Sequence, residues 1–181
     1  MEVPHPTNVK GFSSVIRELA ERGTKNNSLE IPTVESIDKL YESISNLIIS
    51  AQDNGPKSVV VDLREFTYLL AEKAVYFHLS SFSPNSSGRD RRLDFVNCLK
   101  QMEKVFRDKN RDYGNSFRFW GITGLVVRIG DKVFRIKQLS NKHYKRKIRD
   151  EKMPDTALDL ANYAVMLLIL LNENRGIKLG Q

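Results

Sequence analysis

The feature that most constrains this chain is the apolar run that follows Asn162. From Ala164 to Leu171 every residue is apolar, so a helix formed here has no polar face to turn toward water. A helix that is apolar all round is buried, which predicts that this helix lies at the centre of the fold. The run is too short to span a membrane. Asp159 and Asn162 precede it, and polar groups at the start of a buried helix need partners.

Apolar residues recur at helical spacing along most of the remaining sequence. They predict helices over residues 12–22, 33–52, 58–79, 91–108, 124–139 and 154–174. Thr33 is the expected N-cap of the second helix, and Gly23 is expected to close the first. We therefore expect an all-α bundle of about six helices. Ser, Pro, Asn and Gly residues at 80–88 predict a loop between an N-terminal helical extension, residues 1–90, and a second domain, residues 91–181.

The positive charge of the chain is concentrated in one block. The net charge is +7, but residues 89–149 hold 18 Lys and Arg against 6 Asp and Glu, a balance of +12. Such a block predicts an anionic partner: a nucleotide, a nucleic acid or both. The single cysteine, Cys98, excludes an intramolecular disulfide framework and fits a reducing compartment. Because the start of the sequence lacks the features of a signal peptide, we expect a cytoplasmic location.

Charged side chains share a face on each of two expected helices. They are Arg128, Asp131, Lys132 and Arg135 on one helix, and Asp155, Asp159 and Asn162 on the last. If these faces meet, they form a pocket with carboxylates on its floor and cations on its rim. This arrangement suits Mg²⁺ and a phosphate, because Mg²⁺ is usually held by one or two carboxylates plus substrate phosphates. The alternative is a solvated face, on which each ion pair contributes about 0.2–0.5 kcal/mol.

Two other segments have two interpretations each. The aromatic residues Phe117, Phe119 and Trp120 lie between glycines, and such a cluster either packs in a core or stacks a base. The basic run over residues 142–149 is either a solvated segment or a track for the phosphate backbone of a nucleic acid.

Three separated blocks of sequence resemble, in order, the first type of nucleotide modification associated domain, a family of bacteria and phages. The blocks are K-x-x-DYG-x-S from Lys109 to Ser116, G-x-x-x-R-x-x-DK-x-x-R from Gly124 to Arg135, and DE-x-x-x-DT-x-x-DLANY from Asp150 to Tyr163. The resemblance covers roughly residues 99–174 and implies a role linked to the modification of nucleotides or DNA bases.

A second similarity is to the all-α nucleoside triphosphate pyrophosphohydrolases of the MazG type. Asp159-Leu-Ala-Asn162 looks like their E-x-x-D motif, and Asp131 stands in place of their first acidic motif. This similarity implies a MazG-like core, Mg²⁺ and a homo-oligomer with its site across a subunit contact. The sequence departs from the pattern in having the neutral Asn162 and a single acid in the first motif, which weakens metal binding.

These resemblances assign expected roles to individual residues. Asp131, Asp155 and Asp159 would be catalytic, as Mg²⁺ ligands or water-orienting bases, with Glu151 as a further metal ligand. The substrate-binding residues would be Lys109, Arg128, Lys132 and Arg135 for phosphates and Asp112, Tyr113 and Asn162 for base or sugar edges. The structural alternative is an ion-pair network that only holds the helices together.

The sequence therefore predicts a nucleotide-binding protein of phage or bacterial nucleotide metabolism. Its first form is a Mg²⁺-dependent nucleoside triphosphate pyrophosphohydrolase or a degenerate relative. The second is a module that sequesters a nucleotide without turning it over, and the third is an accessory protein that binds nucleic acid through residues 142–149. We expect a nucleotide or nucleoside triphosphate as partner, no membrane partner, and a homo-oligomer.

Overall fold

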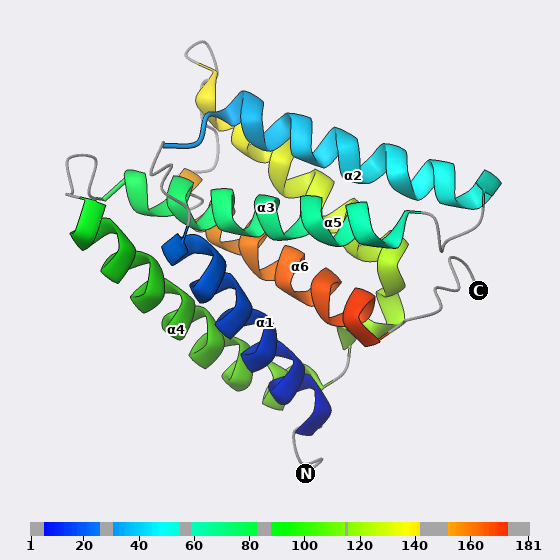
Figure 1. The fold of residues 1–181 in the computed structure, drawn as a ribbon, viewed down its shortest axis with the longest axis horizontal. Helices are drawn as coiled ribbons and strands as arrows, with labels where there is room; N and C mark the ends of the chain where they lie inside the picture. Colours follow the sequence, from blue (N-terminus) through cyan, green and yellow to red (C-terminus); the bar gives the residue numbers. More distant parts are fainter. Residues whose placement is uncertain are drawn as a thin grey trace.

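The computed structural model describes residues 6–25, 31–54, 59–82, 88–114, 116–141 and 152–173. In this part of the chain the regular structure is helical, without a strand (Figure 1). The helices are α1 (Pro6–Lys25), α2 (Val34–Asn54), α3 (Val60–Ser80), α4 (Gly88–Tyr113), α5 (Ser116–Ser140) and α6 (Met153–Glu173). The expectation of an all-α bundle of about six helices is confirmed.

Helix α6 lies at the centre of the bundle. It packs against α1, α3, α4 and α5, and Figure 1 shows it running between α3 and the α1–α4 pair. Leu160, Leu167 and Leu168 are fully buried. By length and composition α6 would also pass for a membrane-crossing helix, the only one among the described residues, but 61% of that stretch is buried inside the bundle. The surrounding helices thus explain why the chain tolerates so continuous an apolar run.

Helices from both halves of the chain share one core. Phe12 of α1 stacks on Phe106 of α4 with ring centroids 4.0 Å apart, and Phe106 meets the edge of Phe117 of α5 at 6.1 Å. Helix α3 packs along α6. The predicted boundary near residue 90 stays a prediction. The column of three aromatic rings nevertheless ties the N-terminal helix to residues that lie in the C-terminal half.

Helix α5 begins earlier than the sequence predicted, at Ser116 instead of near residue 124. Gly121 interrupts it with φ 62° and ψ −170°, in the left-handed region that glycine enters at little cost. The turn before Gly121 buries Phe117, which is 4% exposed. This burial stabilises a short helical stretch before the glycine, and the non-helical Gly121 separates it from the longer stretch that follows.

Gly23 lies inside α1, which continues to Lys25, so the prediction that it closes the helix is wrong. The glycine is needed for close packing. A Cβ at this position would lie 2.5 Å from Cε1 of Phe95, a ring that is fully buried. Phe95 cannot move away, because it stacks on Tyr76 at 4.5 Å, and Tyr76 Oη donates a hydrogen bond to the carbonyl of Gly23 at 3.2 Å.

We predict that Gly23→Ala destabilises the protein by about 1–3 kcal/mol, because it overpacks a filled core. Without the clash, the same change in a helix would stabilise it by about 0.5–1 kcal/mol. Urea denaturation of the two proteins measures the difference. In a Phe95→Leu background, where the ring is absent, the added methyl group should cost less. A Gly23→Ala protein as stable as the parent would contradict the packing described for α1 and α4.

The thiol of Cys98 faces the core and is 5% exposed. Burial raises the pKa of this thiol to about 11, so it is protonated at neutral pH and is no nucleophile. We predict that a disulfide reagent such as DTNB labels the native protein at pH 8 far more slowly than the urea-unfolded protein. Equal rates in the two states would show that the thiol is accessible. Because Cys98 is the only cysteine, the signal needs no assignment.

Candidate functional site

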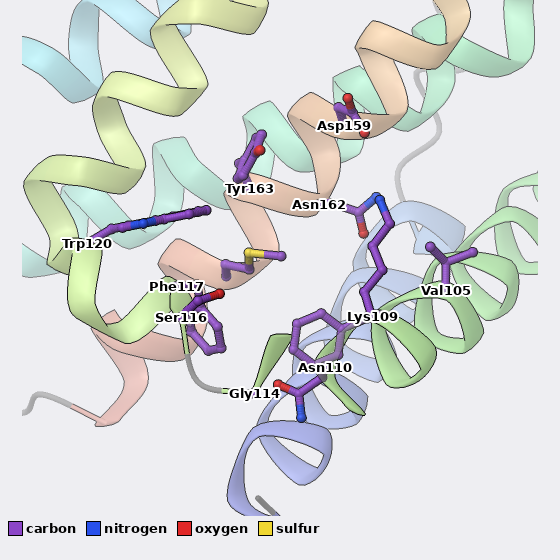
Figure 2. Close-up of a pocket in the computed structure, with 12 residues that line it drawn as sticks. Val105, Lys109, Asn110, Gly114, Ser116, Phe117, Trp120, Asp159, Asn162 and Tyr163 are labelled. Atoms are coloured by element: carbon purple, nitrogen blue, oxygen red, sulfur yellow. The ribbon is translucent and has the colours of Figure 1, made fainter. Parts of the chain in front are cut away.

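A cavity of about 390 Å³ opens between the end of α4, the start of α5 and α6. Figure 2 shows the side chains that line it. The volume lies within the range of about 300–1,000 Å³ that is typical of small-molecule pockets. Two of the three motif blocks, Lys109 to Ser116 and Asp150 to Tyr163, supply lining residues.

The first block places its residues by ending one helix and starting the next. Lys109 and Asn110 lie in the last turns of α4 and line the cavity together with Val105 and Phe106. Gly114 follows with φ 59°, and its N–H donates to the carbonyl of Asn110 at 2.9 Å. A left-handed glycine of this kind is a common helix end. It explains the glycine of the motif, which lets the chain turn and bring Ser116 back to the cavity.

Helix α6 contributes one face at offsets of three, four and seven residues. Asp159, Asn162, Tyr163 and Met166 line the cavity. The intervening residues Leu160 and Ala161 are fully buried on the other side. Asn162 Nδ2 donates to the carbonyl of Leu158, one turn back, at 3.0 Å. The D-L-A-N-Y block therefore alternates between pocket residues and core residues, because 3.6 residues make one helical turn.

The pocket has an apolar floor and a charged rim. Phe106 is 3% and Phe117 is 4% exposed, and Met166 also lines the cavity. Lys109 is exposed, and its side chain extends from α4 toward Asn162 of α6 (Figure 2). A ligand that fits this pocket would therefore bury an apolar part on the floor and keep an anionic part at the rim.

Aromatic rings form one wall of the pocket. Trp120 and Tyr163 lie with centroids 6.2 Å apart at an angle of 53°. The guanidinium carbon of Arg128 lies 5.3 Å from the centre of the Trp120 ring, within the range of a cation–π contact. The aromatic cluster predicted from sequence separates in the structure: Phe117 is buried, Trp120 lines the pocket, and Phe119 is 91% exposed.

One ion pair joins the middle motif block, Gly124 to Arg135, to the pocket. Lys132 Nζ of α5 lies 3.0 Å from Oδ2 of Asp159, which lines the cavity on α6. Arg128 and Asp131 form a second, more exposed pair at 3.8 Å along α5. The first pair joins two helices, as in the alternative in which charges only hold the helices together, and it also places a lysine and a carboxylate at the pocket; the second lies within α5.

The structure brings together only part of the predicted site. Lys109, Asp159 and Asn162 line the cavity. Arg128 and Lys132 do not line it, but they contact two lining residues, Trp120 and Asp159 respectively. Other residues predicted for the site are described but do not line the cavity: Asp131, Arg135 and Asp155. The side chains of Asp112 and Tyr113, the whole of Glu151 and the basic run 142–149 lie outside the described residues.

The predicted Mg²⁺ ligands do not form a complete set in the described structure. No group of three or more His, Cys, Asp or Glu side chains that could hold a metal is present among the residues described. Asp155 and Asp131 are exposed, and Asp159 pairs with Lys132. Because Glu151 lies outside the described residues, the ligand set of Asp131, Glu151, Asp155 and Asp159 stays a prediction.

Sequence reasoning missed Asn110, a pocket residue that is 4% exposed. A signal was present, because Asn110 continues the buried face of α4. Leu99, Met102 and Phe106 precede it at helical spacing, and all three are buried. A polar residue at the next position of such a face is informative, since buried polar groups need partners.

The described residues thus form an all-α protein with a cavity that has an apolar floor, an aromatic wall and a cationic rim. Residues 109–171 match the model of the family described as nucleotide modification associated domain 1, so the resemblance seen in the sequence is confirmed for this part of the chain. No curated protein and no solved structure matches the chain. The similarity to MazG-type enzymes stays a prediction.

We predict that the cationic surroundings of Trp120 bias its quenching by ions. Trp120 is the only tryptophan, is 39% exposed and lies beside Arg128. Iodide should quench its fluorescence more than caesium does at low ionic strength, because the nearby positive charge attracts anions. Arg128→Ala should lower the ratio of iodide to acrylamide quenching by roughly twofold. Arg17→Ala on α1 removes the same charge away from the pocket, and an equal effect of that variant would refute the local explanation.

Proposed function

We propose that this protein binds a nucleotide in the pocket between α4, α5 and α6, with the base on the floor and the phosphates at the rim. The observation that carries the proposal is the convergence of two family motif blocks on one cavity. The remaining block, Gly124 to Arg135, is joined to the same cavity through the ion pair between Lys132 and Asp159. Residues that the family motif spreads over the sequence thus gather around a volume of nucleotide size.

The floor and wall suit a nucleobase. A base is flat and apolar on its faces, and stacking on an aromatic side chain contributes about 1–3 kcal/mol per base. Trp120 and Tyr163 offer ring faces at the wall, and Phe106 and Phe117 offer buried apolar surface below them. This is the support for placing the base, and not the phosphates, inside the pocket.

The rim suits phosphates. Lys109 has an exposed ammonium group that needs no rearrangement to meet an anion. Lysine binds phosphate as a point charge, and arginine can do so with two hydrogen bonds. Arg128 is the arginine at this wall, because its guanidinium group lies 5.3 Å from the centre of the Trp120 ring. A nucleotide with its base stacked on the wall would place its phosphates near these two cations.

Binding without turnover is the form that the described residues support best. Asp159 is the only carboxylate among the described lining residues, and Lys132 neutralises it at 3.0 Å. Mg²⁺ prefers several oxygen ligands in octahedral geometry, and a single lysine-paired carboxylate does not meet that need. Mg²⁺-dependent pyrophosphate release remains the second candidate, carried by the position of Asp159 at the pocket.

We predict that deoxynucleotides quench or shift the emission of Trp120 on binding, and that isothermal titration gives matching affinities. Lys109→Ala should weaken binding of a nucleoside triphosphate about 10- to 100-fold, because a contact to a charged group is lost, while the affinity for the nucleoside barely changes. Lys104→Ala is the matched control, an exposed lysine on the same helix that does not line the cavity.

The same titrations separate binding from hydrolysis. Incubation with deoxynucleoside triphosphates and Mg²⁺, followed by a pyrophosphate assay, should give no release above that of the buffer. Release that Asp159→Asn abolishes would establish the hydrolase instead. If neither binding nor release occurs with any of the common nucleotides, the assignment of the pocket is wrong.

A further inference from the structure

A second hollow, open to solvent and of about 500 Å³, lies on the surface between α1 and α4. The two helices pack against each other and run side by side in Figure 1. Cationic side chains and serine hydroxyls dominate the lining, and no carboxylate contributes to it among the described residues. The lining residues are Val9, Lys10, Ser13, Ser14, Arg17 and Arg107. Such a lining favours an anionic partner.

The charges of this hollow are available to a partner. Lys10 and Arg17 are exposed, and within the described part of the chain neither forms an ion pair or a hydrogen bond. Arg107 pairs with Glu103 at 2.6 Å, and Ser13 Oγ donates to the same carboxylate at 2.5 Å. Glu103 is partly buried, so the acid closest to the hollow is already satisfied and does not oppose an anion there.

Helix α4 extends the positive charge beyond the hollow. Exposed cations follow one another along this helix at intervals of four, three and four residues, which places them on one face. They are Lys100, Lys104, Arg107 and Arg111. At a rise of 1.5 Å per residue the row is about 16 Å long. Asp108 is the single exposed acid in residues 100–111. We call this row, together with Lys10 and Arg17, the α1–α4 face.

The α1–α4 face is separate from the pocket between α4, α5 and α6. Arg107 lines the hollow and Lys109 lines the pocket. Residues two apart on a helix point about 200° away from each other, so these two cations turn to opposite sides of α4. An anion on the α1–α4 face therefore neither occupies nor blocks the pocket.

The shape of the charge distribution indicates which anion fits. A row of single cations matches a polymer with regularly repeated charges, and duplex DNA carries one negative charge per about 1.7 Å of its axis. Lysine, arginine and serine side chains are common contacts to phosphate oxygens. A membrane-binding helix needs a large apolar face to insert, and α1 has no exposed large hydrophobic residue among those described.

The α1–α4 face also lacks the means to stack bases. The exposed aromatic residues of the described chain are Phe82, Phe119, Trp120 and Phe134, and none belongs to α1 or α4. Proteins that bind single strands combine a basic groove with aromatic rings on which the bases stack. A duplex keeps its bases stacked inside and presents only its backbone, so it is the better match for a face of cations and hydroxyls.

We infer that the α1–α4 face binds the phosphate backbone of double-stranded nucleic acid without reading its sequence. Phosphate contacts position a protein on a duplex but carry no direct sequence information. The inference goes beyond nucleotide binding in the pocket and does not rest on it. It gives a role to α1, which lies outside the matched residues 109–171.

Fluorescence anisotropy with a short labelled DNA duplex tests this inference on the full chain. If three or four phosphates are contacted, raising the salt concentration from about 50 to about 200 mM should weaken binding about 40- to 150-fold. The double variant Lys10→Ala with Arg17→Ala should weaken binding about 10- to 100-fold at the lower salt concentration. It should also reduce the slope of log K against log salt by about two, equally for duplexes of different sequence.

The matched control is the double variant Lys39→Ala with Lys137→Ala. It removes the same two charges from exposed positions on α2 and α5, and it should bind the duplex like the parent. Thermal melting checks the fold of each variant, and the exposed, unpaired Lys10 and Arg17 should be replaceable without a change in Tm. An equal loss in the control would show that net charge alone acts, and it would overturn the inference.

Three further outcomes would overturn the inference. Duplex binding that the Lys10 and Arg17 variant leaves unchanged would place the contact elsewhere, for example on residues 142–149. Binding to the single strand as tight as to the duplex would refute the choice of partner, as would tighter binding to phosphatidylserine vesicles. No duplex binding at the lower salt concentration would refute the site. None of these results touches nucleotide binding, which the Trp120 titrations measure separately.

Discussion

The structure depends on burying the apolar side chains of α6. Fully burying a leucine side chain contributes about 1.5–3 kcal/mol, and Leu160, Leu167, Leu168 and Leu171 are each 0–1% exposed. No single neighbour can cover a helix that is apolar all round, so α1, α3, α4 and α5 surround it. The same requirement brings the end of α4 and the start of α5 together beside Asp159 and Asn162 of α6, and the pocket forms at that meeting point.

The pocket therefore combines a floor of buried rings with charged side chains that are exposed at its rim. Its floor residues Phe106 and Phe117 belong to the aromatic column that begins at Phe12, so the core fixes their positions. Lys109 at the rim is exposed, and the ion pair of Lys132 with Asp159 is partly solvated. A binding site gains selectivity from preorganised buried groups and tolerates mobile charges outside them, and this pocket has that division.

The sequence predicted the parts of the fold that local patterns control. The apolar run after Asn162 has one stable environment, so the central position of its helix could be predicted, and Thr33 Oγ1 accepts a hydrogen bond from the N–H of Ser36 at 3.1 Å as expected of a helix cap. The short helical stretch from Ser116 was missed, because a glycine directly after an aromatic cluster predicts a break but not the helix that precedes it. The tertiary burial of Phe117, which local patterns do not encode, stabilises that stretch.

The candidate site could be predicted only in part for a related reason. Spacing shows which residues share a helix face, but not toward which neighbour that face turns. Asp131 and Lys132 are adjacent, yet Lys132 pairs with Asp159 of α6 while Asp131 pairs with Arg128 of its own helix. Asn8 and Asn110 form a hydrogen bond although they lie 102 positions apart, and a single sequence carries no signal for such a contact.

Gly121 also divides the contacts of α5 between two stretches. Gly121 separates the stretch that carries Phe117 and Trp120 from the stretch that carries Arg128 and Lys132, and apart from its chain neighbours and the adjoining backbone no atom lies within 4 Å of where its Cβ would be. The two stretches are thus joined by non-helical backbone and are not one continuous helix. The residues on either side of Gly121 therefore take their positions from different neighbours: Phe117 from the ring of Phe106, and Lys132 from its ion pair with Asp159.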